Sequence, residues 1–252
     1  MIRALFFDLF GTLIDIRTNE SDDNVFRVTA NFLAYHGVSM PPDRLKMLYF
    51  ELNRAQRLAR GGTYPEFDVV RLFERIVRHG GGRARRARPL AAAAARVFRA
   101  ASLFRLAPYP GAGAVLTALK KRYRMAVVSD GQRIWEIPEL HAAGIAGFFE
   151  EIVVSGDLGF RKPDPRMYET ALRKMALSPA EVIFVGNDMF RDIYGAKSIG
   201  MKAVFFDSGL GGRDGRGAAP DAVIRRLDDL PGIVEKLDDR PASAKPPFTA
   251  AF

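Results

Sequence analysis

Cysteine is absent from this chain of 252 residues, which also holds only three histidines and one tryptophan. Without cysteine there are no disulfide bonds and no thiolate metal sites, which fits a reducing compartment and predicts a cytoplasmic protein. Long apolar runs are missing as well. The run from Ile2 to Phe7 is ended by Asp8, so it predicts neither a signal peptide nor a membrane span, and we expect no membrane association.

Positive charge is concentrated in one segment. Residues 71–101 hold nine arginines against one glutamate, a net charge of +8, whereas the whole chain has a net charge of +9. Two interpretations stay open: a solvated charged face, or a patch that steers anionic substrates. No aromatic residue lies between Arg78 and Arg96, although stacking aromatics are typical of nucleic-acid sites. We therefore expect no nucleic-acid partner.

Strand-like apolar runs recur along the chain, and helical patterns separate those that follow residue 107. Nearly continuous apolar strands are typical of a parallel sheet covered on both faces. The six runs are Ile2–Phe7, Met125–Ser129, Glu151–Ser155, Glu181–Gly186, Lys202–Phe206 and Ala222–Arg225. Their alternation with helices predicts an α/β fold with a doubly wound, Rossmann-like parallel sheet.

Residues 18–102 break this alternation because they show only helical patterns. Apolar residues recur at helical spacing in three stretches, with proline and glycine pairs or triplets between them. We therefore predict an all-helical domain inserted after the first strand. The predicted division is 1–17 and 103–237 for the core, 18–102 for the helical domain, and 238–252 for a loose tail rich in proline and alanine.

Polar residues follow several of the predicted strands. Asp8 ends the first run, at the carboxyl edge of the sheet where open α/β folds bind their ligands. Gly11 and Thr12 then turn the chain, so that Asp8 stays at this edge and does not enter a helix. Three further segments come later in the chain: Ser129-Asp130-Gly131, Lys162 in Arg161-Lys162-Pro163-Asp164-Pro165, and Gly186-Asn187-Asp188 with Asp192.

Taken in order, the four segments resemble the motifs of the haloacid dehalogenase-like hydrolase superfamily, in its branch with a helical cap. The resemblance covers roughly residues 1–17 and 103–210, and it implies that the helical domain is the cap. It implies that Asp8 is the nucleophile, with Thr12 beside it in the catalytic set. The implied site for a transferred phosphoryl group consists of Ser129, the backbone amides at Asp130 and Gly131, and Lys162.

The resemblance also implies a Mg²⁺ site. Its ligands would be Asp8, Asp188 and the backbone carbonyl of Phe10, with Asp192 binding directly or through water and also orienting Lys162. Oxygen ligands of this kind suit a hard cation. In most phosphatases of the superfamily an aspartate that acts as general acid stands two residues after the nucleophile. Here that position is Phe10, so the usual proton donor is missing.

Several functions remain open for a chain with Phe10 at this position. A Mg²⁺-dependent phosphatase of small phosphorylated metabolites would show weak protonation of its leaving group. A 2-haloacid dehalogenase needs no such acid, and Lys162 to Tyr168 resembles that branch, but Asp188 is a metal ligand that a dehalogenase does not need. A phosphonate hydrolase would need a cap lysine, for which Lys46 is the candidate, and a non-catalytic binding protein is a fourth alternative.

We interpret the chain as a hydrolase with an aspartate nucleophile, and as a phosphatase in preference to a dehalogenase. The expected cofactor is Mg²⁺ and the expected partner is a small anionic substrate. The protein is expected to be a monomer or a homodimer. The sequence of the cap shows no readable pocket, so the substrate itself stays open.

Overall fold

The structure is a computed structural model that describes residues 1–82 and 84–238. Its centre is a six-stranded sheet in the order β5-β4-β1-β6-β7-β8, in which every pair of neighbours is parallel. The strands are β1 (Ala4–Phe7), β4 (Arg124–Ser129), β5 (Glu151–Val154), β6 (Val182–Gly186), β7 (Lys202–Phe206) and β8 (Ala222–Ile224). All six lie within the predicted apolar runs or extend them by one residue, and the predicted doubly wound α/β fold is confirmed.

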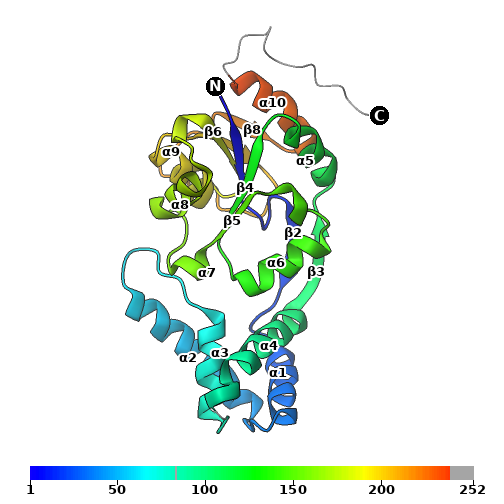
Figure 1. Cartoon of the computed structure of the whole chain (residues 1–252), viewed down its shortest axis with the longest axis vertical. Coiled ribbons are helices and arrows are strands. Elements are labelled where there is room, and N and C mark those ends of the chain that lie inside the picture. Colours follow the sequence, from blue (N-terminus) through cyan, green and yellow to red (C-terminus); the bar gives the residue numbers. More distant parts are fainter. Residues whose placement is uncertain (83, 239–252) are drawn as a thin grey trace.

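Helices cover both faces of this sheet (Figure 1). Alternate side chains of each strand point to opposite faces, so Leu5 and Phe7 pack in one apolar cluster and Ala4 and Phe6 in another. The first cluster contains α5 (Ala112–Lys120), α6 (Arg133–Ala142) and α10 (Leu230–Leu237), and the second contains α8 (Pro165–Met175) and α9 (Gly195–Ser198). No helix in residues 1–82 and 84–238 is long and apolar enough to cross a membrane.

Short helical segments follow two of the strands. A four-residue helix, α7 (Ser155–Leu158), comes directly after β5, and a π-helix over Met189–Tyr194 follows β6. Single 3-10 turns occur at Ala146–Phe148, Pro179–Glu181 and Leu227–Asp229. The last residue described, Asp238, is buried and accepts hydrogen bonds from the Ile2 amide and the Tyr123 hydroxyl. The predicted tail after it, residues 239–252, lies outside the described residues.

Four helices form a second unit below the sheet in Figure 1. They are α1 (Asp23–Tyr35), α2 (Pro42–Arg60), α3 (Val69–His79) and α4 (Ala84–Ser102). Aromatic rings fill its separate core, where Tyr49 stacks on Phe98 and both contact Phe26 and Phe73. The sequence patterns indicated only three of these helices. The fourth was missed because, apart from Phe98, the buried apolar residues of α4 are alanines and not large side chains.

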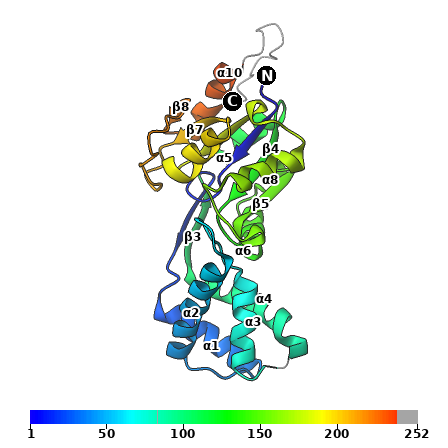
Figure 2. The same cartoon turned by 90° about the vertical axis from the view of Figure 1, so that its left-hand side faces the viewer.

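A two-stranded ribbon connects the four-helix unit to the sheet (Figure 2). Its strands, β2 (Ile14–Thr18) and β3 (Leu103–Pro108), pair antiparallel with Ile14 opposite Pro108. The sequence analysis did not predict this ribbon. Neither strand is buried on a whole face, and Phe104 is 71% exposed, so the alternation of apolar and polar residues that marks a half-buried strand is absent.

Arg99 on α4 ties the helical unit to the core. Its guanidinium bonds to Glu139 on α6 at 2.6 Å and to Glu20, after the ribbon, at 3.0 Å. It also lies 5.7 Å from the ring centre of Phe10 and 5.0 Å from that of Trp135. The Arg99 and Glu139 side chains are 12% and 6% exposed, so each charge is largely removed from water and is stabilised mainly by the other.

Replacing this arginine should therefore destabilise the protein. We expect Arg99→Met to lower the free energy of unfolding by about 3 kcal/mol, because Glu139 is left buried without its partner. The measurement is urea unfolding followed by circular dichroism. Arg96→Met, at an exposed position one turn earlier on α4, is the matched control and should change stability little. Equal effects of the two substitutions would show that the Arg99 ion pairs add nothing to stability.

Candidate active site

Polar residues from three neighbouring strands meet at the carboxyl edge of the sheet. Asp8 follows β1, Ser129 is the last residue of β4, and Asp188 comes two residues after the end of β6. Since β1 lies between β4 and β6 in the sheet, Asp8 is at the centre of this group. Lys162 reaches it from the loop between α7 and α8. This edge is where doubly wound sheets bind ligands.

The Asp8 carboxylate is fixed by two hydrogen bonds. Its Oδ1 accepts from Lys162 Nζ at 2.7 Å, and its Oδ2 accepts from Thr12 Oγ1 at 2.8 Å. The tight turn after Asp8 places Thr12 there and requires Gly11, which has φ of +83°. A Cβ atom at Gly11 would lie 2.3 Å from Nδ2 of Asn187. The turn thus presents the carboxylate in one orientation, 7% exposed.

Lys162 bridges two carboxylates. Its Nζ donates to Asp8 Oδ1 and to Asp192 Oδ1, both at 2.7 Å, and the residue is only 3% exposed. Burial alone would lower the pKa of Lys162, but the neighbouring carboxylates of Asp192 and Asp8 outweigh it and raise this pKa above its ordinary value. The ammonium therefore keeps its charge beside Asp8. A carboxylate can approach an anionic substrate only if such a cation offsets the repulsion.

The segment Ser129-Asp130-Gly131 is engaged differently from what the sequence indicated. Ser129 Oγ donates to Glu136 Oε1 at 2.9 Å, and the Gly131 amide donates to Ser155 Oγ at 2.9 Å. Asp130 Oδ1 accepts from the Lys162 amide at 2.9 Å, so this side chain positions the loop that carries the lysine. In the structure the Gly131 amide is thus already paired, whereas the sequence analysis expected it to face a phosphoryl oxygen.

Asp188 is held in place by the groups around it. Its Oδ1 accepts from the amides of Phe190 and Arg191, and its Oδ2 accepts from the Gly212 amide and lies 3.0 Å from Arg191 Nη2. Burial works against its ionisation, yet these hydrogen bonds and the Arg191 charge lower the pKa of Asp188 below its ordinary value. The Asp188 carboxylate is therefore ionised at neutral pH.

The Asp192 carboxylate is engaged mainly by hydrogen bonds from groups of the protein. Its Oδ1 accepts from Lys162, and its Oδ2 accepts from the amides of Asn187 and Asp188 at 3.0 and 2.9 Å. Burial raises the pKa of Asp192, while Lys162 opposes that rise. Of the two roles expected for Asp192, this geometry favours orientation of Lys162 over direct contact with a metal.

The charge of this edge suits a divalent cation, but its carboxylates are not already grouped as metal ligands. Three buried aspartates, at positions 8, 188 and 192, and the partly buried Asp130 face two cations, Lys162 and Arg191, so the formal net charge of the group is −2. The donors are all oxygens, as Mg²⁺ prefers. Among residues 1–82 and 84–238, however, no three His, Asp or Glu side chains are grouped so that they could hold a metal ion. The three converging carboxylate ligands expected from the sequence are therefore not preassembled.

Glu136, Arg191 and Gly212 contact the site but were missed by the sequence analysis. Glu136 lies seven residues after Ser129, in a helix whose sequence carries no motif. Arg191 is one of many arginines in the chain, and no motif distinguishes it from the others. The glycine pair at 211–212, in the loop that follows the buried strand β7, was a usable signal. A Cβ atom at Gly211 would lie 1.7 Å from the Asn187 carbonyl oxygen, so this loop packs closely on the loop that carries Asp188.

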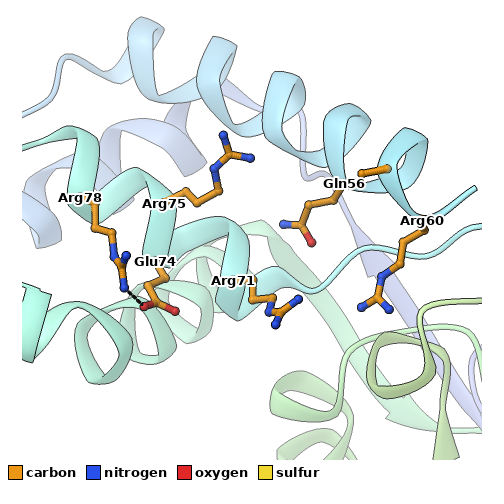
Figure 3. Close-up of a pocket in the computed structure, with 7 residues that line it drawn as sticks. Gln56, Arg60, Arg71, Glu74, Arg75 and Arg78 are labelled. Carbon is orange, nitrogen blue, oxygen red and sulfur yellow. Dashed lines mark hydrogen bonds and ion pairs between the residues drawn. The ribbon is translucent and has the colours of Figure 1, made fainter.

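A separate basic groove lies on the helical unit, between α2 and α3 (Figure 3). It has a volume of about 570 Å³ and contains four arginines and one glutamate, but none of the residues around Asp8. Arg71, Arg75 and Arg78 line one wall about one helical turn apart, and Arg78 pairs with Glu74 at 2.6 Å. The groove places part of the positive segment at the surface, so both interpretations of this charge stay open.

Comparison with known proteins identifies the family. The family model of haloacid dehalogenase-like hydrolases matches residues 2–200, and the chain therefore belongs to this family of enzymes. The resemblance inferred from the four motifs is thus confirmed. Since the members are hydrolases, the protein is an enzyme of that class.

Curated relatives with sequence similarity include two archaeal proteins named glyceraldehyde 3-phosphate phosphatase. The Methanothermobacter thermautotrophicus protein is 42% identical over 106 residues, which is 42% of this chain and 47% of the relative. The Pyrococcus furiosus protein is 29% identical over 97% of this chain and 96% of its own length. The first match thus spans about half of that relative, whereas the second spans nearly all of it.

Among solved structures, a 2-haloacid dehalogenase from Pseudomonas syringae pv. Tomato has a similar fold. It superimposes with a TM-score of 0.68 and 23% sequence identity, over 94% of this chain and 99% of the dehalogenase. At this identity the likeness concerns the fold of both the sheet and the helical unit, and it does not transfer the reaction.

Proposed function

We propose that this enzyme is a Mg²⁺-dependent phosphatase of small phosphorylated metabolites. One observation carries the proposal: the Asp8 carboxylate, held by Lys162 and Thr12, lies at a sheet edge where acidic side chains outnumber basic ones, with a formal net charge of −2. A divalent cation would compensate that negative charge, and Lys162 offsets the repulsion between the Asp8 carboxylate and an anionic phosphate. Relatives named as phosphatases support this reading.

In this proposal the Asp8 carboxylate forms a bond to phosphorus as the bond to the leaving alkoxide breaks, and the alkoxide takes a proton from water. A second water then hydrolyses the acyl phosphate, which releases phosphate and restores the Asp8 carboxylate. Lys162 neutralises the nucleophile and a phosphoryl oxygen, Thr12 orients the carboxylate, and the Ser129 hydroxyl donates to another phosphoryl oxygen. Mg²⁺ would be held by Asp8, Asp188 and the carbonyl of Phe10, with Asp192 fixing Lys162. The metal supplies Lewis-acid polarisation of the phosphate.

The helical unit serves as a cap in this proposal and selects the substrate. Residues 18–102 would form the cap, and 1–17 with 103–237 the catalytic core. The two strands of the ribbon and the Arg99–Glu139 ion pair connect them, so closure of the cap would bring its residues over Asp8. The partner is a small anionic metabolite, and the basic groove raises the local concentration of anions.

A 2-haloacid dehalogenase is the second candidate, because Phe10 leaves the site without the usual acid. A halide leaves without a proton and needs no metal. We test the two functions with aryl phosphates, acyl phosphates, glyceraldehyde 3-phosphate and 2-chloropropionate, each with and without Mg²⁺. Release of phosphate only with Mg²⁺ supports the phosphatase, and release of chloride without metal contradicts it.

Restoring the missing acid tests the role of Phe10. We expect Phe10→Asp to raise activity on alkyl phosphates more than on aryl phosphates, because an alkoxide needs a proton in the transition state and a nitrophenolate hardly does. The gain should be far below the full value of about 10²- to 10⁴-fold, because Arg99, over the ring position, would lower the pKa of the new acid. The measurement is the ratio of kcat/KM for the two classes.

The matched control for this substitution is Phe10→Asn, which has the same shape as the aspartate but cannot act as an acid. It should change activity on both phosphate classes by a similar factor. A selective gain in the asparagine variant, or none in the aspartate variant, would mean that Phe10 acts by shaping the pocket.

A further inference from the structure

The Ser129 hydroxyl has one proton, and two acceptors compete for it: Glu136 and a bound phosphoryl oxygen. In the structure this proton is donated to Glu136 Oε1, at an Oγ–Oε1 distance of 2.9 Å. A phosphoryl oxygen bound at Ser129 can only accept hydrogen bonds, so Ser129 must donate to it. Both bonds cannot exist while Glu136 is an acceptor. A carboxylate accepts only, whereas a protonated carboxyl can donate.

The Glu136 side chain is enclosed by the protein. It is completely buried on α6, and its Oε2 has no hydrogen-bond partner among the described residues. The backbone of Gly131 closes one side, since a Cβ atom there would lie 2.1 Å from Glu136 Oε1. A buried carboxyl with one unpartnered oxygen is costly as an anion and much less so as a neutral acid.

The charges around Glu136 leave it without a cation of its own. Lys162 is bound to Asp8 and Asp192, and Arg99, from the packed helix α4, is bound to Glu139. Across the Gly131 backbone, Ser155 Oγ donates to Glu66, which pairs with Arg57 at 2.8 Å. Every nearby cation thus already compensates another carboxylate.

We propose that the enzyme binds phosphate with Glu136 protonated, and that the Glu136 carboxyl then donates a hydrogen bond to Ser129 Oγ, which turns the Ser129 hydroxyl toward a phosphoryl oxygen. Glu136 is then a positioning residue, since it acts on the substrate through Ser129. This rests on the proposed function, which places the phosphoryl group at Ser129. The protonated Glu136 and Ser129 then form an uncharged chain of hydrogen-bond donors on the β4 side of Asp8. The proposed metal ligand Asp188 lies on the other side, after β6.

Burial raises the pKa of Glu136 to about 8, with the Ser129 hydrogen bond opposing the rise and the Glu139 and Asp8 charges adding to it. Below this pH the carboxyl is neutral and can donate to Ser129. Above it, the carboxylate accepts the hydrogen bond of the Ser129 hydroxyl, which is then turned away from the phosphate, and its negative charge repels the phosphate. Phosphate affinity should therefore be retained at neutral pH and lost as the pH rises through about 8.

The experiment measures binding of inorganic phosphate with Mg²⁺ by calorimetry across this pH range, in the wild type and in Glu136→Gln. From about pH 7 to about pH 9.5 the wild-type Kd should rise on the order of 30-fold, in proportion to the lost protonated fraction. In Glu136→Gln, whose amide cannot ionise, the Kd should stay nearly flat. Phosphate itself titrates in the same way in both experiments, so the ratio of the two Kd values at each pH removes this contribution.

Two controls separate this role from others. Glu169→Gln, on the exposed face of α8, should keep the wild-type pH profile. A purely structural role of Glu136 would make Glu136→Gln weaker at every pH with an unchanged slope, which would overturn the inference. A wild-type Kd for phosphate that does not rise above pH 8 would overturn it too. Absence of phosphate binding in all three proteins would instead overturn the proposed function, and this inference with it.

Discussion

Asp8→Asn should lower turnover of the best phosphomonoester by at least about 10⁴-fold while the protein stays folded. The substitution removes the nucleophilic charge but keeps the volume of the side chain. Lys162 can still donate to the amide oxygen in the place of Oδ1, and the amide NH2 in the place of Oδ2 can donate to Thr12 Oγ1. Lys162 also keeps Asp192 as its counter-ion at 2.7 Å. The loss should therefore appear in kcat and not in the thermal unfolding midpoint.

The measurement is steady-state turnover together with circular dichroism melting. Asp43→Asn, at an exposed position in the first turn of α2, is the matched control and should leave turnover unchanged. Turnover of Asp8→Asn within about tenfold of the wild type, with an unchanged fold, would contradict the role of Asp8 as nucleophile.

Removal of metal is the second change with a large expected effect. We expect EDTA to lower phosphatase activity by at least about 10²-fold, and an excess of Mg²⁺ to restore it. The reason is the surplus of negative charge around Asp8, which a phosphate dianion would increase further. An equal ionic strength of sodium chloride should not restore activity.

Direct binding makes this prediction independent of turnover. In calorimetry Mg²⁺ should bind the wild type, and Asp188→Asn should weaken that binding by at least about tenfold because one carboxylate ligand is lost. Asp214→Asn, in the exposed loop after β7, is the control and should bind Mg²⁺ as the wild type does. Full activity in EDTA would contradict the proposed metal dependence.

The core strands could be predicted from the sequence because burial on both faces leaves an unbroken apolar run. The run Val182–Gly186 is fully buried, for example, and shows no polar residue. The ribbon of β2 and β3 has no such signal, since it is largely exposed and depends on pairing between segments about 90 residues apart. Helix α4 was missed for a related reason: apart from Phe98, its buried apolar residues are alanines, and a run of alanines can also be read as a compositional bias.

Residues at strand ends could be expected near one another, because parallel strands end at one edge of the sheet. This argument covered Asp8, Ser129 and Asp188, all of which lie at that edge. It could not specify hydrogen-bond partners, which tertiary packing decides. Ser129 donates to Glu136 and the Gly131 amide to Ser155, and neither acceptor carries a motif that marks it.

The central claim is that Asp8 forms a covalent acyl phosphate. The most direct measurement quenches the enzyme in acid during turnover of a phosphomonoester with a radiolabelled phosphoryl group, and maps the label by peptide digestion. We predict label on the peptide that contains Asp8, released by neutral hydroxylamine and absent from Asp8→Asn. Label on a different peptide, or steady turnover with neither label nor a burst of alcohol at any quench time, would contradict the claim.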